Sequence, residues 1–233
     1  MNERYFNFPV QLLRGFLINP IRALNSISNY AFYETYSKIE TGSKKERMKE
    51  SAHYYGIGFG NFEEALQNGK ELYDSIPPNS PKVGLRLSIY WDFYKNDKAE
   101  FEKVCLLGFL ALKSILGQKP YCKTTNKFWL SRMDGNPKTI KDFSELSPDI
   151  VKFSKDYQTD KIKKALRNEW GLITYSRYCR GFYVSFKITL KQLIFEAEKR
   201  RISTKEKQYK EHEQQTLKEV RELLNRTRPS HDL

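Results

Sequence analysis

The sequence predicts a mainly α-helical protein with a small β component. Apolar residues recur three and four positions apart over most of the chain, which is the spacing of a buried helix face. Strand-like alternation is confined to residues 83–93 and to a hairpin-like stretch at residues 172–190. A chain of 233 residues with 39% hydrophobic residues can bury a sizeable core. We therefore expect a folded protein with helices throughout and little sheet.

Residues 1–80 are expected to form a helical N-terminal region. Apolar side chains at helical spacing follow Pro9 and continue after Pro20, where a proline should break or kink the helix. Asn61 with Glu64 three residues later has the residue types of a helix-capping pair. This pair predicts a further helix, which should end before the next two prolines.

A linker over residues 77–81 should separate this region from a basic domain over residues 81–195. Six apolar residues alternate from Val83 to Phe93, which favours a strand and leaves a helix as the alternative. We expect this strand to pair with a strand over residues 182–190 and so to join the two regions in one core.

The next helix is expected to open at the capping pair Asp97 and Glu100 and to end at Gly117. A long connection over residues 117–146 follows, and it contains a short helix over residues 126–133. This connection is longer than a compact three-helix arrangement needs.

Two more helices and a hairpin follow. Ser147-Pro148 predicts a helix over residues 148–155, because proline is favoured at the first helical position. A turn at residues 156–158 should lead into a helix over residues 159–170, with Thr159 as its N-cap. Strands over residues 172–178 and 182–190 are joined by a short Cys-Arg-Gly link, which predicts a β-hairpin.

The net charge of +13 is concentrated in one part of the chain. Residues 96–195 carry 19 Lys/Arg and 10 Asp/Glu, a net of +9, whereas residues 1–95 and 196–233 each have a net of +2. A basic region of this kind favours partners with phosphate or carboxylate surfaces. The excess coincides with the last two helices and the hairpin.

A basic helix followed by a hairpin with Arg177 and Arg180 near its tip resembles the last helix and wing of a winged-helix DNA-binding domain. The resemblance covers about residues 97–190 and rests on element order and charge. The helix over residues 148–155 would be the second of three, with residues 126–133 as the alternative. The resemblance implies a partner of double-stranded DNA, with contacts from Lys161, Lys163, Lys164, Arg167, Asn168, Arg177, Arg180, Lys187, Lys123, Lys127 and Arg132.

In this interpretation the helix over residues 159–170 enters a major groove, and the hairpin reaches the adjacent backbone or minor groove. Replication initiation or transcriptional control, including control from a mobile element, fits such a module. Two rival hypotheses stay open. One is an RNA-binding accessory protein that stacks bases on Tyr178, Phe182 and Tyr183. The other is a protein–protein adaptor that uses the aromatic N-terminal region.

The chain lacks the sequence patterns of common catalytic, zinc and nucleotide sites. A Gly-x-Gly-x-Gly run at residues 56–60 has no following Lys-Ser/Thr, so it favours a structural turn. We therefore expect no enzyme activity, cofactor or metal. Three widely spaced cysteines fit a reducing cytoplasm, and no apolar run reaches transmembrane length. A charged C-terminal helix or tail over residues 196–233 carries a narrow apolar stripe of Leu217, Val220 and Leu224. This stripe could dock the last turns of a solvated helix, or it could form a homodimer contact.

Overall fold

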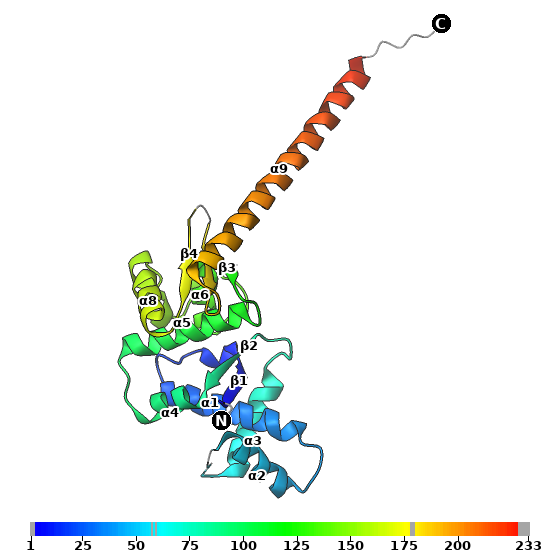
Figure 1. Ribbon diagram of the computed structural model, residues 1–233. Coiled ribbons are helices and arrows are strands. Elements are labelled where there is room, and N and C mark those ends of the chain that lie inside the picture. The colour runs from blue at the N-terminus through cyan, green and yellow to red at the C-terminus, as the bar shows by residue number, and fades with distance from the viewer. Residues whose placement is uncertain (1–2, 57, 59, 178–179, 228–233) are drawn as a thin grey trace.

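The computed structural model describes residues 3–56, 58, 60–177 and 180–227, without the side chains of the last four. Helices make up 64% of the chain and strands 9%, so the expected mainly α protein with a small β component is confirmed. Figure 1 shows helix α5 between two groups of elements, with the N-terminal elements on one side and the hairpin, α8 and α9 on the other. No helix of the described ranges is both long and apolar enough to cross a membrane.

The N-terminal group contains a strand that the sequence analysis missed. Phe6 and Phe8 are fully buried and Asn7 between them is exposed, which is the two-residue period of a strand. The strand ends at Pro9, and where a helix was expected after this proline only a short 3-10 helix forms, over Val10–Leu13. The group comprises β1 (Tyr5–Pro9), η1 (Val10–Leu13), α1 (Pro20–Lys38), α2 (Lys44–Tyr55), α3 (Phe62–Ser75), β2 (Lys82–Arg86) and α4 (Leu87–Lys95). The capping role of Asn61 is confirmed, since its side chain accepts hydrogen bonds from two backbone N–H groups at the start of α3.

The strand expected over residues 83–93 is only half correct. It ends at Arg86, and its partner is β1 rather than residues 182–190. Leu87, Tyr90 and Phe93 lie three residues apart and pack as one face of helix α4. The expected boundary between residues 80 and 81 therefore separates β2 from its partner strand. One hydrophobic cluster nevertheless runs through both groups of elements.

The second group is built around α5, α6 and α8. The Trp129 side chain is fully buried against α5, and its indole N–H donates to the Gly108 carbonyl at 3.0 Å. The helix expected over residues 148–155 starts at Pro148 as expected but forms only over Pro148–Val151. Because this helix is so short, α6 is the second helix that packs here. The elements are α5 (Glu100–Leu116), β3 (Cys122–Thr124), α6 (Asn126–Met133), η2 (Phe143–Glu145), α7 (Pro148–Val151), α8 (Asp156–Glu169), β4 (Ile173–Tyr175), β5 (Phe182–Ser185) and α9 (Leu190–Thr227).

Two helix starts differ from those expected. Helix α8 begins at Asp156, so the expected turn at residues 156–158 is its first turn. Thr159 is fully buried and its hydroxyl donates to the Asp156 carbonyl, which places it inside the helix rather than at its cap. Helix α5 begins after Ala99, whose N–H donates to Glu102 Oε2 at 2.9 Å.

The hairpin is confirmed, with Tyr175 opposite Tyr183, and β3 pairs along the other edge of β5. Gly181 has φ +89°, and a Cβ there would lie 2.1 Å from the Thr124 carbonyl oxygen, so glycine is needed where the hairpin meets β3. The second strand stops at Ser185, because its hydroxyl accepts hydrogen bonds from the Lys187 and Ile188 N–H groups.

Helix α9 then starts at Leu190, where a strand was expected. Thr189 caps it, since its hydroxyl accepts from the Gln192 N–H and the Gln192 side chain accepts from the Thr189 N–H. The expected boundary between residues 195 and 196 therefore lies within one helix.

Candidate nucleic-acid interface

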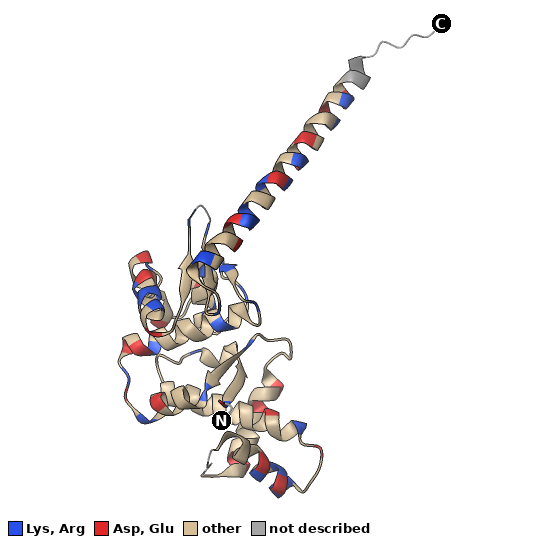
Figure 2. Cartoon of the chain, in the orientation of Figure 1, with Lys and Arg blue, Asp and Glu red and all other residues tan. Residues whose placement is uncertain are grey.

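The outer face of α8 carries three of the expected contact residues. Ile162 and Leu166 are fully buried on its inner face, beside Gly108 of α5. Lys161, Lys164 and Asn168 are exposed on the outer side, three and four residues apart. The Lys161 ammonium also lies 4.6 Å from the centre of the Phe101 ring of α5. Figure 2 shows α8 as a mixture of blue and red. Helix α8 contains four Lys/Arg and three Asp/Glu, a net charge of +1, so α8 alone is only weakly positive.

Lys163 does not belong to this outer face. Its side chain is only 13% exposed, and its ammonium lies 3.2 Å from an Asp160 carboxylate oxygen. It also lies 4.4 Å from the centre of the Phe182 ring, where a cation is attracted to the aromatic face. Lys163 therefore packs between α8 and the sheet, and the sequence-based assignment of this residue to DNA contacts is not supported.

Arg132 and Lys127 also have structural partners. The Arg132 side chain is buried, donates to the Pro137 carbonyl at 3.1 Å and lies over the Phe128 ring. Burial lowers the pKa of its guanidinium. The Lys127 ammonium donates to the Lys141 carbonyl at 2.7 Å. These two cations hold the connection between α6 and α7, so neither is placed to contact a phosphate freely.

Arg167 and Lys187 differ in where they lie. The Arg167 guanidinium donates to the Thr174 hydroxyl at 3.1 Å, which ties α8 to β4 while the residue stays exposed. Lys187 is exposed beyond the end of β5, opposite the hairpin tip, with its ammonium 3.5 Å from the Gln118 carbonyl. Arg167 thus remains near the proposed contact surface, whereas Lys187 lies apart from it.

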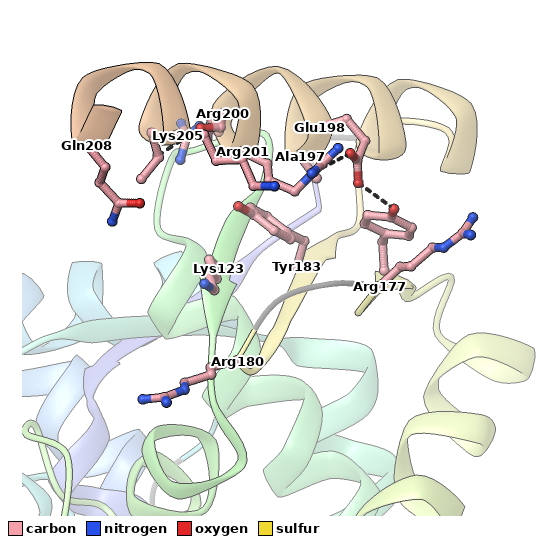
Figure 3. Close-up of a pocket in the computed structure, with 12 residues that line it drawn as sticks. Lys123, Arg177, Arg180, Tyr183, Ala197, Glu198, Arg200, Arg201, Lys205 and Gln208 are labelled. Atoms are coloured by element: carbon pink, nitrogen blue, oxygen red, sulfur yellow. Dashed lines mark hydrogen bonds and ion pairs between the residues drawn. The ribbon is translucent and has the colours of Figure 1, made fainter. Parts of the chain in front are cut away.

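A groove between the hairpin and α9 brings together cations from β3, from the hairpin and from α9, and Figure 3 shows the residues that line it. Its volume is about 330 Å³. Six Lys/Arg side chains line it against one carboxylate, Glu198, so its lining has a net charge of +5. We call this surface the basic groove; its cations are Lys123, Arg177, Arg180, Arg200, Arg201 and Lys205.

Glu198 connects the two walls of the basic groove. The Tyr175 hydroxyl donates to Glu198 Oε1 at 2.7 Å, and Arg201 Nε donates to Oε2 at 2.6 Å. These hydrogen bonds lower the pKa of Glu198, and the same bond to the carboxylate raises the pKa of the Tyr175 hydroxyl. The only carboxylate among the described lining residues thus has Tyr175 and Arg201 as its partners, and the lining as a whole stays predominantly cationic.

A small apolar cluster lies beneath the basic groove. Leu193 and Ala197 of α9 pack on Tyr183 of β5, and all three are buried. Phe182, the next residue along β5, is buried on the opposite side in the main core. Phe182 is 4% exposed, and Tyr183 is 8% exposed although it lines the groove, so their burial does not favour the RNA-stacking hypothesis. The third residue of that hypothesis, Tyr178, lies outside the described residues.

Sequence reasoning missed three cations of the basic groove, namely Arg200, Arg201 and Lys205. It assigned them to a solvated tail, because mixed charges dominate that segment. One signal was present: Leu193, Ala197 and Arg201 lie four residues apart and so share a helix face. An apolar face that changes to a basic one marks the point where α9 leaves the sheet.

No family model, curated protein or solved structure matches this chain. The functional argument therefore rests on the side chains themselves. Within the described ranges, no three or more His, Cys, Asp or Glu side chains gather where they could hold a metal ion. The chemistry that the basic groove offers is the binding of an anionic surface.

Proposed function

We propose that residues 100–185 and the start of α9 form a winged-helix-like module that binds duplex DNA. The observation that carries the proposal is the basic groove, whose six cations face one carboxylate beside the hairpin. The element order supports it, because three helices are followed by a hairpin, and β3 widens the sheet at the base of that hairpin. Phosphates supply most of the affinity in such a complex, and cations are their natural partners.

In the proposed complex, α8 lies in a major groove and the hairpin follows the adjacent backbone. Lys161 and Lys164 contact phosphates or base edges, and Asn168 has the amide needed for a paired contact with adenine. The basic groove, on the other side of the hairpin, holds a second stretch of backbone. Contacts to phosphate set position, and the α8 side chains set any base preference.

Two rival functions have less support. Binding of unpaired RNA bases would need exposed aromatic rings, and Phe182 and Tyr183 are buried. An adaptor role for the N-terminal group would need a broad apolar surface. The large hydrophobic residues exposed there include Ile18, Tyr54 and Tyr73, but most of its aromatic rings pack inside the group.

The test is a titration of the full chain with duplex DNA at a series of salt concentrations. If about six Lys/Arg neutralise phosphates, log affinity should fall against log salt with a slope of roughly −5. A groove variant, with Lys123, Arg180 and Lys205 replaced by alanine, should flatten that slope by about one unit per lost contact. The fold should survive, because all three residues are exposed.

A matched variant removes the same charge far from the hairpin, with alanine at Lys45, Lys49 and Lys70 of α2 and α3. It should leave the slope nearly unchanged. If the two triple variants weaken binding equally, the charge acts diffusely and the proposal is wrong. Single-stranded DNA and structured RNA serve as competitors, and displacement of the duplex by either would favour a different nucleic acid.

A further inference from the structure

Helix α9 extends far beyond the elements that support it, as Figure 1 shows. It has 38 residues, yet only its first turns pack on the sheet through Leu193 and Ala197. Every residue from 202 to 223 is exposed. A single solvated helix has little stability of its own in water, so a helix of this length is typically stabilised by packing.

The exposed part of α9 carries an apolar stripe. Ile202, Tyr209, Thr216 and Leu223 follow one another at seven-residue intervals, and Val220 lies three residues before the last. The four hydrophobic members are between 45% and 72% exposed. Thr216 donates its hydroxyl to the His212 carbonyl of its own helix. At 3.6 residues per turn, this stripe lies on the side of α9 opposite the residues that dock on the sheet.

The charges of the same segment divide into two halves of opposite sign. Residues 199–210 carry six Lys/Arg and one Glu, a net of +5. Residues 211–222 carry four Glu and two Lys/Arg, a net of −2. Some of these charges border the stripe: Lys205 lies three residues after Ile202, and Glu219 lies four before Leu223.

We propose that two copies of this chain associate through α9 in an antiparallel pair that crosses near residue 211. This orientation sets the basic half of each helix against the acidic half of the other, and brings Ile202 near Val220 and Leu223 of the second copy. A parallel pair would oppose like charges, which costs free energy. Most of the basic groove stays open, because Arg200 and Thr204 lie on the other side of the helix, and only Lys205 of its cations borders the stripe.

The first experiment measures the sedimentation of the full chain over a range of concentrations and salt. We expect a monomer–dimer equilibrium that weakens as salt rises, because the paired charges are screened. Tyr209→Asp, which places a charge in the stripe, should raise the dissociation constant at least about tenfold. Gln214→Asp adds the same charge on the opposite side of the helix and should change the dissociation constant little. A chain that stays monomeric at every concentration overturns the proposal.

The second experiment tests orientation by disulfide formation between engineered cysteines. An equimolar mixture of Ile202→Cys and Leu223→Cys chains, distinguished by an affinity tag on one of them, should form a mixed disulfide. Ile202→Cys alone should form no more disulfide dimer than the unsubstituted chain does. Efficient self-linking of Ile202→Cys without a mixed product would show a parallel pair, and the antiparallel assignment would be wrong.

Discussion

Two helices flank the β4–β5 hairpin, and different contacts hold them in place. Helix α8 inserts Ile162 and Leu166 into the main core, where both are fully buried. Helix α9 docks its first turns through Leu193 and Ala197 on a small separate cluster, and through hydrogen bonds from tyrosines to its glutamates. The position of α8 therefore depends on the main hydrophobic core, whereas α9 is held by local contacts.

The two sides of the hairpin also differ in charge. Helix α8 has a net charge of +1, and Lys163 and Arg167 on it already have protein partners. The lining of the basic groove has a net of +5. In a complex with DNA, a firmly seated helix suits positioning and base contacts, and a dense cationic surface suits sequence-independent affinity. Under the proposed function, discrimination between sequences falls to α8 and affinity to the basic groove.

The largest expected effect comes from the buried contacts that anchor α8 in the main core. Ile162→Ala removes fully buried methyl groups from the main core and should lower the free energy of unfolding by about 2–5 kcal/mol. Urea denaturation followed by circular dichroism measures this loss. A loss well below this range would mean that α8 is not anchored in the global core.

The matched change at the other helix is Leu193→Ala, in the small cluster under α9. Its effect should be mainly local, with faster amide hydrogen exchange in residues 190–201 and little change in α5. Equal loss of protection in α9 and α5 would mean that α9, like α8, is held by the main core rather than by local contacts.

A smaller effect is expected for the charges of α8. Replacing Lys161, Lys164 and Arg167 by alanine removes the same charge as the groove variant, but from the weakly positive side of the hairpin. The slope of log affinity against log salt should flatten by less than in the groove variant, while the preference for a selected duplex over a random one should fall. A larger slope change here than in the groove variant would reverse the assignment of the two sides.

Local patterns in the sequence predicted several elements correctly, because short-range chemistry determines them. The cap at Asn61, the end of α8 close to residue 170 and the hairpin across Gly181 each follow from one or two residues. Strand β3 has only three residues and no period of its own, so only its pairing with β5 defines it. This pairing is not visible in the chain before the fold is known.

The basic groove was harder to predict for a related reason. Its cations come from three separate segments, at Lys123, at Arg177 and Arg180, and at residues 200–205. Only the docking of α9 on the sheet brings them together. The reverse holds for Lys163, which has the sequence position of a surface residue but lies against the Phe182 ring. Charge in the sequence thus located the most basic region of the chain but not the side chains that face solvent there.

The smallest predicted effect concerns the hydrogen bond between Tyr175 and Glu198 and its pH dependence. A carboxyl with a lowered pKa stabilises the docked state above its unfolded pKa, and this contribution is lost as pH falls through the lowered value. A tyrosine with a raised pKa stabilises the docked state at every pH below its unfolded pKa, and this stabilisation is lost as pH rises through the raised pKa. Docking of α9 should therefore be strongest near neutral pH and weaken on both sides.

Tyr175→Phe tests this directly, because it removes the hydrogen bond that contributes most to the lowered pKa of Glu198 and leaves Arg201 as its hydrogen-bond partner. The pKa of Glu198 should rise toward its ordinary value, as measured by a carboxyl carbon NMR titration. In the unsubstituted chain, opening of residues 194–201 should increase at alkaline pH as Tyr175 ionises. In Tyr175→Phe, hydrogen exchange should no longer show this increase. Tyr121→Phe is the matched control, since Tyr121 donates to Glu196 rather than to Glu198. It should leave the pKa of Glu198 unchanged. If the pKa of Glu198 rises equally in both variants, then a general loosening of α9, and not the hydrogen bond from Tyr175, controls this pKa.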